Sequence, residues 1–201
     1  MYKPPAIICD IDGTIADCSH RRHWVSPELF PGEKVKIRNT SGFATYLRTR
    51  REPEWEWPMH DLRLVDGTEV TWQTQSVKKV KRWDKFFAEV SKDTPIPMTI
   101  QAVRLFSENY RILFVSARPN KTRKDTREWM GKHLGHKLAA CDLYMRADDD
   151  QREDSIVKRE IYDTIIDPNY DVHLVLDDRD KVVSMWRRLG LTCWQVAEGN
   201  F

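Results

Sequence analysis

The chain has 201 residues and a net charge of only +2 at pH 7, so any contact with a polyanion must be local rather than spread over the surface. With 40% apolar and 32% charged residues, the composition is that of an ordinary globular protein of one domain, or of one domain with a sizeable insertion. The four cysteines form no Cys-x-x-Cys pair and no apolar run has the length of a membrane span, which argues against a zinc site, a disulfide framework and a membrane partner.

The first predicted element is a buried parallel strand over residues 6–9, which delivers Asp10 and Asp12 to its carboxyl end. In open α/β sheets, ligands bind at this edge. The period-two spacing places the two side chains on opposite faces of a regular strand, so both face one site only if the backbone leaves extended geometry after Asp10. Gly13 is where such a departure costs least.

Two other interpretations of residues 10–14 compete with a catalytic one. Asp, Gly and Thr are common in turns, so the stretch alone is also typical of a strand that ends in an acidic turn. An EF-hand loop requires Gly at its sixth position and Glu at its twelfth, but counted from Asp10 these positions hold Ile15 and Arg21. Such a calcium loop is excluded, and the choice between a turn and a catalytic site depends on partners further along the chain.

Residues 24–79 predict a small β-rich insertion, because apolar and charged residues alternate through this stretch. The strongest signal is a hairpin whose turn is Asp66-Gly67, a dipeptide that favours positive φ. The strands that we expect in the insertion cover residues 35–37, 45–47, 62–65 and 68–72.

The insertion also contains a group of cations close to aromatic residues. Arg48, Arg50 and Arg51 lie near Trp55 and Trp57 in the sequence. Cations mixed with stacking surfaces are typical of proteins that bind single-stranded nucleic acid. A solvated sheet face with tryptophans in the core is an equally good interpretation of the same residues.

From residue 77 onward the pattern predicts alternating helices and strands. Residues 77–90 predict an amphipathic helix, and Pro95 and Pro97 break the chain before a helix capped by Thr99. The expected elements after that helix are strands over 111–115, 143–145, 172–176 and 193–196 and helices over 121–134, from 154 and over 180–189. This alternation implies an α/β fold with a Rossmann-like parallel sheet, right-handed crossovers and helices on both faces.

Polar residues end three of the predicted strands and should meet at one edge of the sheet. They are Asp10 with Asp12, Ser116 with Arg118, and Asp177 with Asp178. Four carboxylates close together repel one another and need a counter-charge. Because no Cys or His cluster accompanies them, the oxygen ligands indicate a hard cation, with Mg²⁺ as the best choice.

Donors near these carboxylates indicate phosphoryl transfer. Ser116, Arg118 and Lys158 can donate hydrogen bonds or positive charge to an anion, and Mg²⁺ with such donors recurs in enzymes that transfer phosphoryl groups. A carboxylate beside the metal can attack phosphorus and form an aspartyl-phosphate. A second carboxylate can protonate the leaving oxygen and then activate water.

These residues resemble the motifs of haloacid dehalogenase (HAD) superfamily phosphohydrolases. Residues 10–14, Asp-Ile-Asp-Gly-Thr, fit the first motif, Ser116 the second, Lys158 the third and Asp177-Asp178 the fourth. Over residues 6–23 and about 80–201 the chain is most similar to the 3′-phosphatase domain of phage-type polynucleotide kinase/phosphatase. The subfamily resemblance rests on Arg21, Ser116-Ala117-Arg118, Asp154 with Lys158, and the tail from Leu176 to Val196.

The resemblance implies a division of the chain and a role for each matching residue. It implies a HAD-like core of residues 1–23 and 80–201 with residues 24–79 as an inserted, cap-like subdomain. Asp10 would be the nucleophile and Asp12 the general acid and base. The remaining roles would be phosphoryl binding by Ser116 and Lys158, substrate binding by Thr14, Arg21, Arg118 and Asp154, and Mg²⁺ binding by Asp10, the Asp12 carbonyl, Asp177 and above all Asp178. A surface pair of Asp154 and Lys158, four residues apart on a helix, is the alternative for these two.

The resemblance also implies a substrate class. We expect a Mg²⁺-dependent phosphomonoesterase acting on 3′-phosphate ends of polynucleotides, in the end healing of nucleic-acid repair. The alternatives are a nucleotidase for free nucleoside monophosphates and a catalytically idle nucleic-acid binding module. No Gly-x4-Gly-Lys-Ser/Thr motif is present, so a separate kinase or ligase is an expected partner. Without a signal core after Met1, we expect a cytoplasmic location, in the host if a phage encodes the chain.

Overall fold

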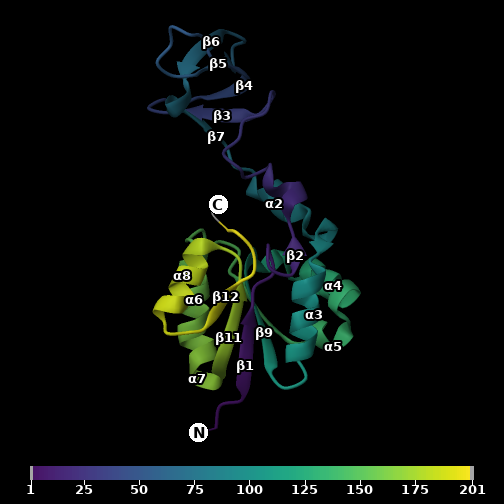
Figure 1. The fold of residues 1–201 in the computed structure, drawn as a ribbon. Helices are drawn as coiled ribbons and strands as arrows, with labels where there is room; N and C mark the ends of the chain where they lie inside the picture. Colours follow the sequence, from purple (N-terminus) through teal and green to yellow (C-terminus); the bar gives the residue numbers. More distant parts are fainter. Residues whose placement is uncertain (1, 200–201) are drawn as a thin grey trace. The chain divides into compact units, whose positions relative to one another are not determined.

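The computed structural model describes residues 2–199, which form two compact units (Figure 1). The first unit comprises the residues up to His20 and those from Phe87 onward, and the second is Arg21–Phe86. The predicted insertion, residues 24–79, falls inside the second unit. Among residues 2–199, no helix combines the length and the apolar character needed to cross a membrane.

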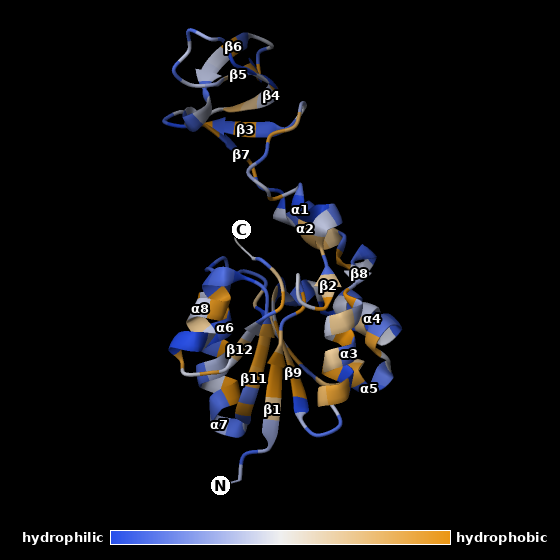
Figure 2. Ribbon diagram, viewed as in Figure 1, coloured by the Kyte–Doolittle hydropathy of each residue, from blue (hydrophilic) through white to orange (hydrophobic). Residues whose placement is uncertain are grey.

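The first unit is built on a five-stranded parallel sheet in the order β10-β9-β1-β11-β12. Its strands are β1 (Pro5–Cys9), β9 (Arg111–Pro119), β10 (Asp142–Arg146), β11 (Asp171–Asp177) and β12 (Cys193–Gln195). The first strand of the chain therefore takes the central place, between strands that come more than a hundred residues later. In Figure 2 the middle of this sheet, β1, β9 and β11, is largely orange, as expected for strands buried on both faces.

Helices cover both faces of this sheet, and the alternation of side chains along β1 shows how. Ile7 and Cys9 face one apolar cluster, and Ala6 and Ile8 face the other. The first cluster is closed by α3 (Pro97–Phe106), α4 (Arg123–Leu134) and α5 (His136–Ala139). The second is closed mainly by α8 (Asp180–Arg188), with contributions from α6 (Asp154–Ile161) and η4 (Tyr162–Ile166), after which the short helix α7 (Asp167–Asn169) leads to β11. The predicted α/β fold with a parallel sheet and helices on both faces is confirmed.

After β1 the backbone turns sharply, as the spacing of Asp10 and Asp12 requires. The amides of Ile15 and Ala16 both donate to the carbonyl of Ile11, at 3.0 and 2.9 Å, so the chain closes a tight turn there. Gly13 has a φ of +80°, the left-handed region in which glycine is favoured. Short strand β2 (Ala16–Asp17) then pairs with β8 (Thr94–Pro95), and α1 (Ser19–Arg22) follows.

The second unit is a five-stranded antiparallel sheet in the order β6-β5-β4-β3-β7. Its elements are β3 (Lys34–Ile37), β4 (Phe43–Arg50), β5 (Met59–Leu64), β6 (Glu69–Gln73), the 3-10 turn η1 (Thr74–Ser76) and β7 (Val77–Lys79). Four strands follow one another as a meander, and the fifth returns to pair with the first of them. The predicted hairpin around Asp66-Gly67 is confirmed, with β5 and β6 as its arms.

The core of the second unit contains no tryptophan among the described residues. It is formed by Val35, Ile37, Ala44, Tyr46, Leu62 and Val77. Trp57 is 49% exposed and Trp55 is only half-buried. The interpretation of the aromatic residues in this region as core tryptophans is therefore wrong.

Two local predictions in the connecting segments are also wrong. Residues 77–90 are not one helix: β7 takes up Val77–Lys79, helix α2 covers only Trp83–Ala88, and the 3-10 turn η2 covers Val90–Lys92. Pairing of β7 with β3 overrides the helical spacing of the apolar residues. Thr99 does not cap the following helix, because α3 begins at Pro97 with Ile96 at the cap position. Proline is favoured at a first helical position, since its missing amide would have no partner there.

Candidate active site

The carboxyl ends of β1 and β11 place two carboxylates side by side. Cys9 lies opposite Leu176 in the parallel register, so Asp10 and Asp177 are the next residues on their strands. The amide of Asp10 donates to the carbonyl of Leu176 at 2.9 Å, which continues the ladder to this point. Ser116, buried on β9, flanks β1 on its other side.

Lys158, on α6, lies between these carboxylates. Its Nζ is 2.8 Å from Oδ1 of Asp10 and 2.8 Å from Oδ2 of Asp177. The ammonium group is almost wholly buried, and burial alone would lower its pKa, but the two carboxylates raise the pKa of Lys158 above its usual value. The lysine is thus a fixed cation in the site, and its interpretation as half of a surface pair with Asp154 is wrong.

The pKa of Asp10 is likewise shifted by burial and by its charged neighbours. Burial raises the pKa of the Asp10 carboxyl well above its usual value, the Lys158 ammonium lowers it, and the neighbouring Asp177 and Asp178 add to the rise. Three buried carboxylates therefore lie together, with the Lys158 ammonium group 2.8 Å from Asp10. Such an arrangement favours the binding of additional positive charge.

Asp177 is also held from the side of α8. Its Oδ2 accepts from the indole Nε1 of Trp186 at 3.2 Å, and its Oδ1 accepts from the amide of Arg179 at 3.2 Å. Trp186 is fully buried, so the indole forms a rigid support. The carboxylate of Asp177 is therefore oriented by groups on three sides: the lysine, the indole and the backbone.

Asp10, Asp177 and Asp178 form the one group of three or more potential metal ligands found among residues 2–199. One oxygen of each lies within 4.8 Å of the others, and all three residues are buried. Hard carboxylate oxygens at this spacing fit a small divalent cation such as Mg²⁺. The carboxylate of Asp12 is not in the group, which leaves its backbone carbonyl as the predicted ligand.

Gly13 allows Asp178 to approach the turn after β1. A Cβ atom at Gly13 would lie 1.9 Å from Oδ2 of Asp178, a separation that no packed structure tolerates. The glycine of the first motif thus serves the turn and leaves room for the carboxylate of the fourth motif.

Arg118 is fully buried and holds Asp12. The guanidinium donates to Oδ1 of Asp12 from Nη2 at 2.5 Å and from Nε at 3.1 Å. Nη2 also donates to Oδ2 of Asp93 at 2.5 Å, and Nη1 donates to Oγ1 of Thr126 at 3.1 Å. All of these groups belong to the first unit. Arg118 therefore fixes the position of Asp12, and its contact with substrate phosphate stays a prediction.

Asp93 and Thr126 are site residues that the sequence does not reveal. Asp93 precedes β8, and its backbone carbonyl also accepts from Nε1 of Trp129 at 2.7 Å. An isolated aspartate between a short turn and a proline carries no motif. Only its buried position beside Arg118, 25 residues along the chain, indicates its role.

The remaining predicted site residues occupy three different settings. Thr14 is fully buried, and among residues 2–199 its hydroxyl has no hydrogen-bond partner. Asp154 begins α6 and forms ion pairs with Arg146 and Arg179. Arg21 belongs to the second unit, where its guanidinium stacks on the ring of Phe86 at 4.1 Å. Contact of Arg21 with a substrate stays a prediction.

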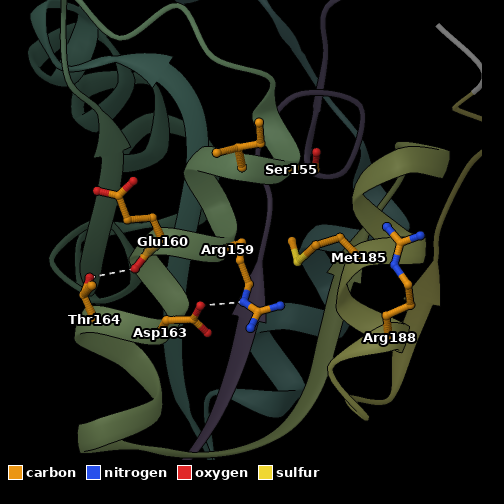
Figure 3. A pocket seen from close by; sticks show the side chains of 8 residues that line it. Ser155, Arg159, Glu160, Asp163, Thr164, Met185 and Arg188 are labelled. Atoms are coloured by element: carbon orange, nitrogen blue, oxygen red, sulfur yellow. Dashed lines mark hydrogen bonds and ion pairs between the residues drawn. The ribbon is translucent and has the colours of Figure 1, made fainter.

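A hollow on the surface of the first unit lies apart from this constellation. Its volume is about 450 Å³, and Figure 3 shows side chains of α6, η4 and α8 around it. The lining residues are Ser155, Ile156, Arg159, Glu160, Asp163, Thr164, Met185 and Arg188. None of them is a predicted catalytic residue, and Arg159 is occupied by Asp163 at 2.5 Å.

The fold and the grouping of Asp10, Lys158, Asp177 and Asp178 define the chain as a HAD-type phosphohydrolase. A model of one family matches residues 64–201, more than half of the chain. The chain belongs to that family, the phosphatase domain of polynucleotide kinase PNKP. The matched range leaves out residues 10–14, but β1 between β9 and β11 brings this first motif to the matched part.

Individual proteins share sequence or fold with this chain. The putative bifunctional polynucleotide kinase/RNA ligase of Autographa californica nuclear polyhedrosis virus is 36% identical over 78 residues, which are 39% of this chain and 11% of the viral protein. A chain of the solved Pnkp1/Rnl/Hen1 RNA repair complex is 24% identical with a TM-score of 0.60, over 99% of this chain and 44% of that one. A second Pnkp1/Rnl/Hen1 complex gives 23% identity and a TM-score of 0.62, over 100% and 48%. The solved structures share the fold, and this chain spans less than half of the length of each of these relatives.

Proposed function

We propose that this chain is a Mg²⁺-dependent phosphomonoesterase that removes the 3′-phosphate from polynucleotide ends through an aspartyl-phosphate. The observation that carries the proposal is the buried Asp10 at the end of β1, with Nζ of Lys158 2.8 Å away and two further carboxylates beside it. A carboxylate with a fixed cation and a place for a second one is suited to attack on a phosphoryl group, whose charge needs neutralising.

The first half of the reaction assigns a task to two aspartates. An oxygen of Asp10 attacks phosphorus, the new Asp10–phosphorus bond forms, and the bond from phosphorus to the 3′ oxygen breaks. Asp12 gives its proton to that leaving oxygen. The two bonds from Arg118 hold the Asp12 carboxyl in place for this transfer.

The second half releases phosphate. Asp12 takes a proton from water, the water oxygen attacks phosphorus, and the bond to Asp10 breaks. Lys158 and Ser116 bind the oxygens of the phosphoryl group during both halves, and the buried hydroxyl of Thr14 is a further donor at the turn. Asp10, Asp177, Asp178 and the Asp12 carbonyl would hold Mg²⁺, which supplies positive charge for the phosphoryl oxygens.

The choice of a polynucleotide end rests on the family and on the names of the relatives. Proteins described as polynucleotide kinase/RNA ligase and as parts of an RNA repair complex both resemble this chain. We infer that the substrate is a 3′-phosphorylated strand and that a kinase or ligase activity acts on the same broken strands.

The deciding experiment measures phosphate release in the presence of Mg²⁺ from three substrates in parallel: a 3′-phosphorylated oligonucleotide, a 3′-mononucleotide and a 5′-mononucleotide. The blank is Asp10→Asn, in which the nucleophile is lost but the volume is kept. We expect its turnover to fall by more than about 1,000-fold. Asp125→Asn, an exposed aspartate on α4, serves as the matched control and should keep full activity.

Hydrolysis of the oligonucleotide well above the mononucleotides is the expected outcome. Release from mononucleotides alone would overturn the polynucleotide assignment and make the chain a nucleotidase. Substantial activity in Asp10→Asn would remove the aspartyl-phosphate from the reaction. Activity that persists in EDTA would remove the metal.

A further inference from the structure

Cations gather on one half of the sheet in the second unit. The neighbouring strands β7, β3 and β4 contain six Lys or Arg and no Asp or Glu. The acidic residues in the strands of this sheet are Asp61 and Glu69, on β5 and β6. Arg21–Phe86 as a whole contains 14 Lys or Arg against nine Asp or Glu, although the net charge of the entire chain is only +2. The positive charge of the protein is therefore local, as any polyanion contact requires.

Four residues of this half, Lys34, Lys36, Phe43 and Lys78, form what we call the lysine patch. Lys36 lies directly opposite Phe43 on one side and opposite Lys78 on the other. Opposed residues of antiparallel strands point to the same face of a sheet, and Lys34 is two residues from Lys36 on the same strand. Val35 alternates with them and faces the apolar core, so the lysine patch lies on the outer face.

The lysine patch is unfavourable for the protein alone. Lys36 and Lys78 are like charges directly opposite each other, which destabilises a sheet. Among residues 2–199, neither lysine has an ion pair or a side-chain hydrogen bond to relieve the repulsion. Phe43 is 40% exposed, and Nζ of Lys34 lies 3.9 Å from the centre of its ring. Lys34 already interacts with this ring, so among residues 2–199 the groups that still lack a partner are Lys36 and Lys78, which a ligand with negative charge would satisfy, while the exposed part of Phe43 stays open to a flat apolar surface.

We propose that the lysine patch binds single-stranded nucleic acid, with backbone phosphates at the lysines and a base stacked on Phe43. The charge requires a polyanion, and the exposed ring favours unpaired bases over a duplex, whose bases are already stacked on one another. The inference rests on the proposed function, because the bound strand is the one whose 3′ end is dephosphorylated. It gives the second unit the task of holding that strand.

Arg48 and Arg50, which the sequence singles out for this task, are less available than the lysines. Both donate to the carboxylate of Asp61, with Nε of Arg48 at 2.8 Å and Nε of Arg50 at 3.1 Å. Arg50 also stacks on Trp55, with 5.1 Å between the guanidinium and the ring centre. Because the carboxylate of Asp61 partly neutralises the two arginines, they attract a phosphate less strongly than unpaired lysines do.

The test measures binding by the full chain of a fluorescent single strand of about 16 nucleotides, with a 3′-hydroxyl end so that there is nothing to hydrolyse. Anisotropy titrations at several salt concentrations give the affinity and its salt dependence. For the double variant Lys36→Gln/Lys78→Gln we expect the slope of log K against log salt to fall by about 1.4, since each phosphate contact on a single strand contributes about 0.7. The matched control, Lys132→Gln/Lys137→Gln on the exposed side of α4 and α5, should keep the slope of the original chain.

A second variant separates stacking from charge. Phe43→Ala should weaken binding about 5- to 150-fold, the loss expected for one stacked base, with the salt slope unchanged. Phe43→Tyr keeps a ring and should restore the affinity. Thermal unfolding of each variant checks the fold, and removal of the like-charge pair should leave the lysine variant at least as stable as the original chain.

Three outcomes would overturn the inference: no binding of the strand by the original chain, an unchanged salt slope in the lysine variant, or full binding by Phe43→Ala. Competition by inorganic polyphosphate as strong as by the oligonucleotide would show a general polyanion surface instead. Hydrolysis of a 3′-mononucleotide should be the same in all patch variants. Absence of phosphate release from a 3′-phosphorylated oligonucleotide by the original chain would contradict the proposed function and leave the binding result standing.

Discussion

Gly13 shows how one residue can serve two motifs that are far apart in the chain. Its φ of +80° makes the turn that follows Asp10, and its missing side chain leaves the space that Asp178 occupies. Both requirements are met because glycine has only a hydrogen atom in place of a side chain: the backbone can adopt the turn, and the Asp178 carboxylate can come close. The turn at Gly13 can be predicted from the sequence, whereas the space for Asp178 becomes apparent only in the structure, where β11 lies beside β1.

We expect Gly13→Ala to damage stability and metal binding together. A left-handed backbone costs a residue with a Cβ atom about 1–2 kcal/mol, and the methyl group would also push the Asp178 carboxylate out of position. Denaturant unfolding should show a loss of about 2–3 kcal/mol. Turnover should require more Mg²⁺ to reach half of its maximum.

The matched control for this change is Gly131→Ala. Gly131 lies within α4 with nothing within 4 Å of a built Cβ, so alanine there should stabilise the helix by about 0.5–1 kcal/mol. Equal unfolding free energies for Gly13→Ala and the original chain would contradict the account of the turn.

The carboxylates of the candidate site could be predicted from the sequence because of where their strands end. Asp10 and Asp177 each follow a run of apolar residues that has no other explanation than a buried strand. The partners that orient them could not be predicted in the same way. Asp93 and Thr126, which hold Arg118 and through it Asp12, have no pattern around them, and they reach the site only because loops and helices pack against the sheet.

At the scale of single elements, an irregularity in β4 decides which side chains surround Asp61. The register between β4 and β5 shifts between Tyr46 and Arg48, so Arg48 and Arg50 fall on the same face as Asp61. The hydrogen bond from Arg48 is the largest cause that holds the pKa of Asp61 below its usual value, with bonds from Thr71 and Arg50 acting in the same direction.

Asp61 should make the free energy of unfolding depend on pH. Because its pKa is lower in the folded state than in the unfolded state, the carboxylate stabilises the fold above the unfolded pKa, and this contribution is lost as the pH falls below about 4. Asp61→Asn should therefore lower the free energy of unfolding by about 1 kcal/mol at pH 7 and by much less at pH 3. Denaturant unfolding at the two pH values is the measurement.

Glu54→Gln, a change at an exposed position in the loop between β4 and β5, is the control for a lost negative charge and should behave alike at both pH values. A deficit of Asp61→Asn that stays the same at pH 3 would assign the effect to packing rather than to the ionised carboxylate.

The wrong helix at residues 77–90 has a physical cause at the same scale. Val77 and Val80 have a spacing that suits a helix, but Val77 closes the core of the second unit as part of β7. The partner of β7 is β3, some forty residues earlier, and a local pattern contains no trace of that pairing. Strand pairs that are close in the sequence, such as β5 and β6, are predicted well because the turn between them is visible.

For the whole molecule, a bound cation should add directly to stability. A ligand that binds only the folded state stabilises it by about 2.7 kcal/mol at a hundredfold excess over its dissociation constant. We expect Mg²⁺ to raise the thermal midpoint of the chain and EDTA to reverse the rise. Asp178→Asn should lose most of this response, because one of the three grouped carboxylates is replaced.

Asp149→Asn, at an exposed position outside the carboxylate group, is the matched control and should respond to Mg²⁺ like the original chain. If Mg²⁺ raised the thermal midpoint of Asp178→Asn as much as that of the control, the cation would bind elsewhere on the protein. Because the readout is unfolding, the result does not depend on the identity of the substrate.

During synthesis, β1 leaves the ribosome well before either of its neighbours in the sheet, which start at Arg111 and Asp171. Both edges of this apolar strand stay open meanwhile, a condition that invites aggregation. The meander of the second unit has mostly local strand pairs, so it can fold within this interval. A nascent chain halted before β11 would thus present a finished second unit while Asp10 still lacks its neighbouring carboxylates, and catalytic competence would be among the last properties that the growing chain acquires.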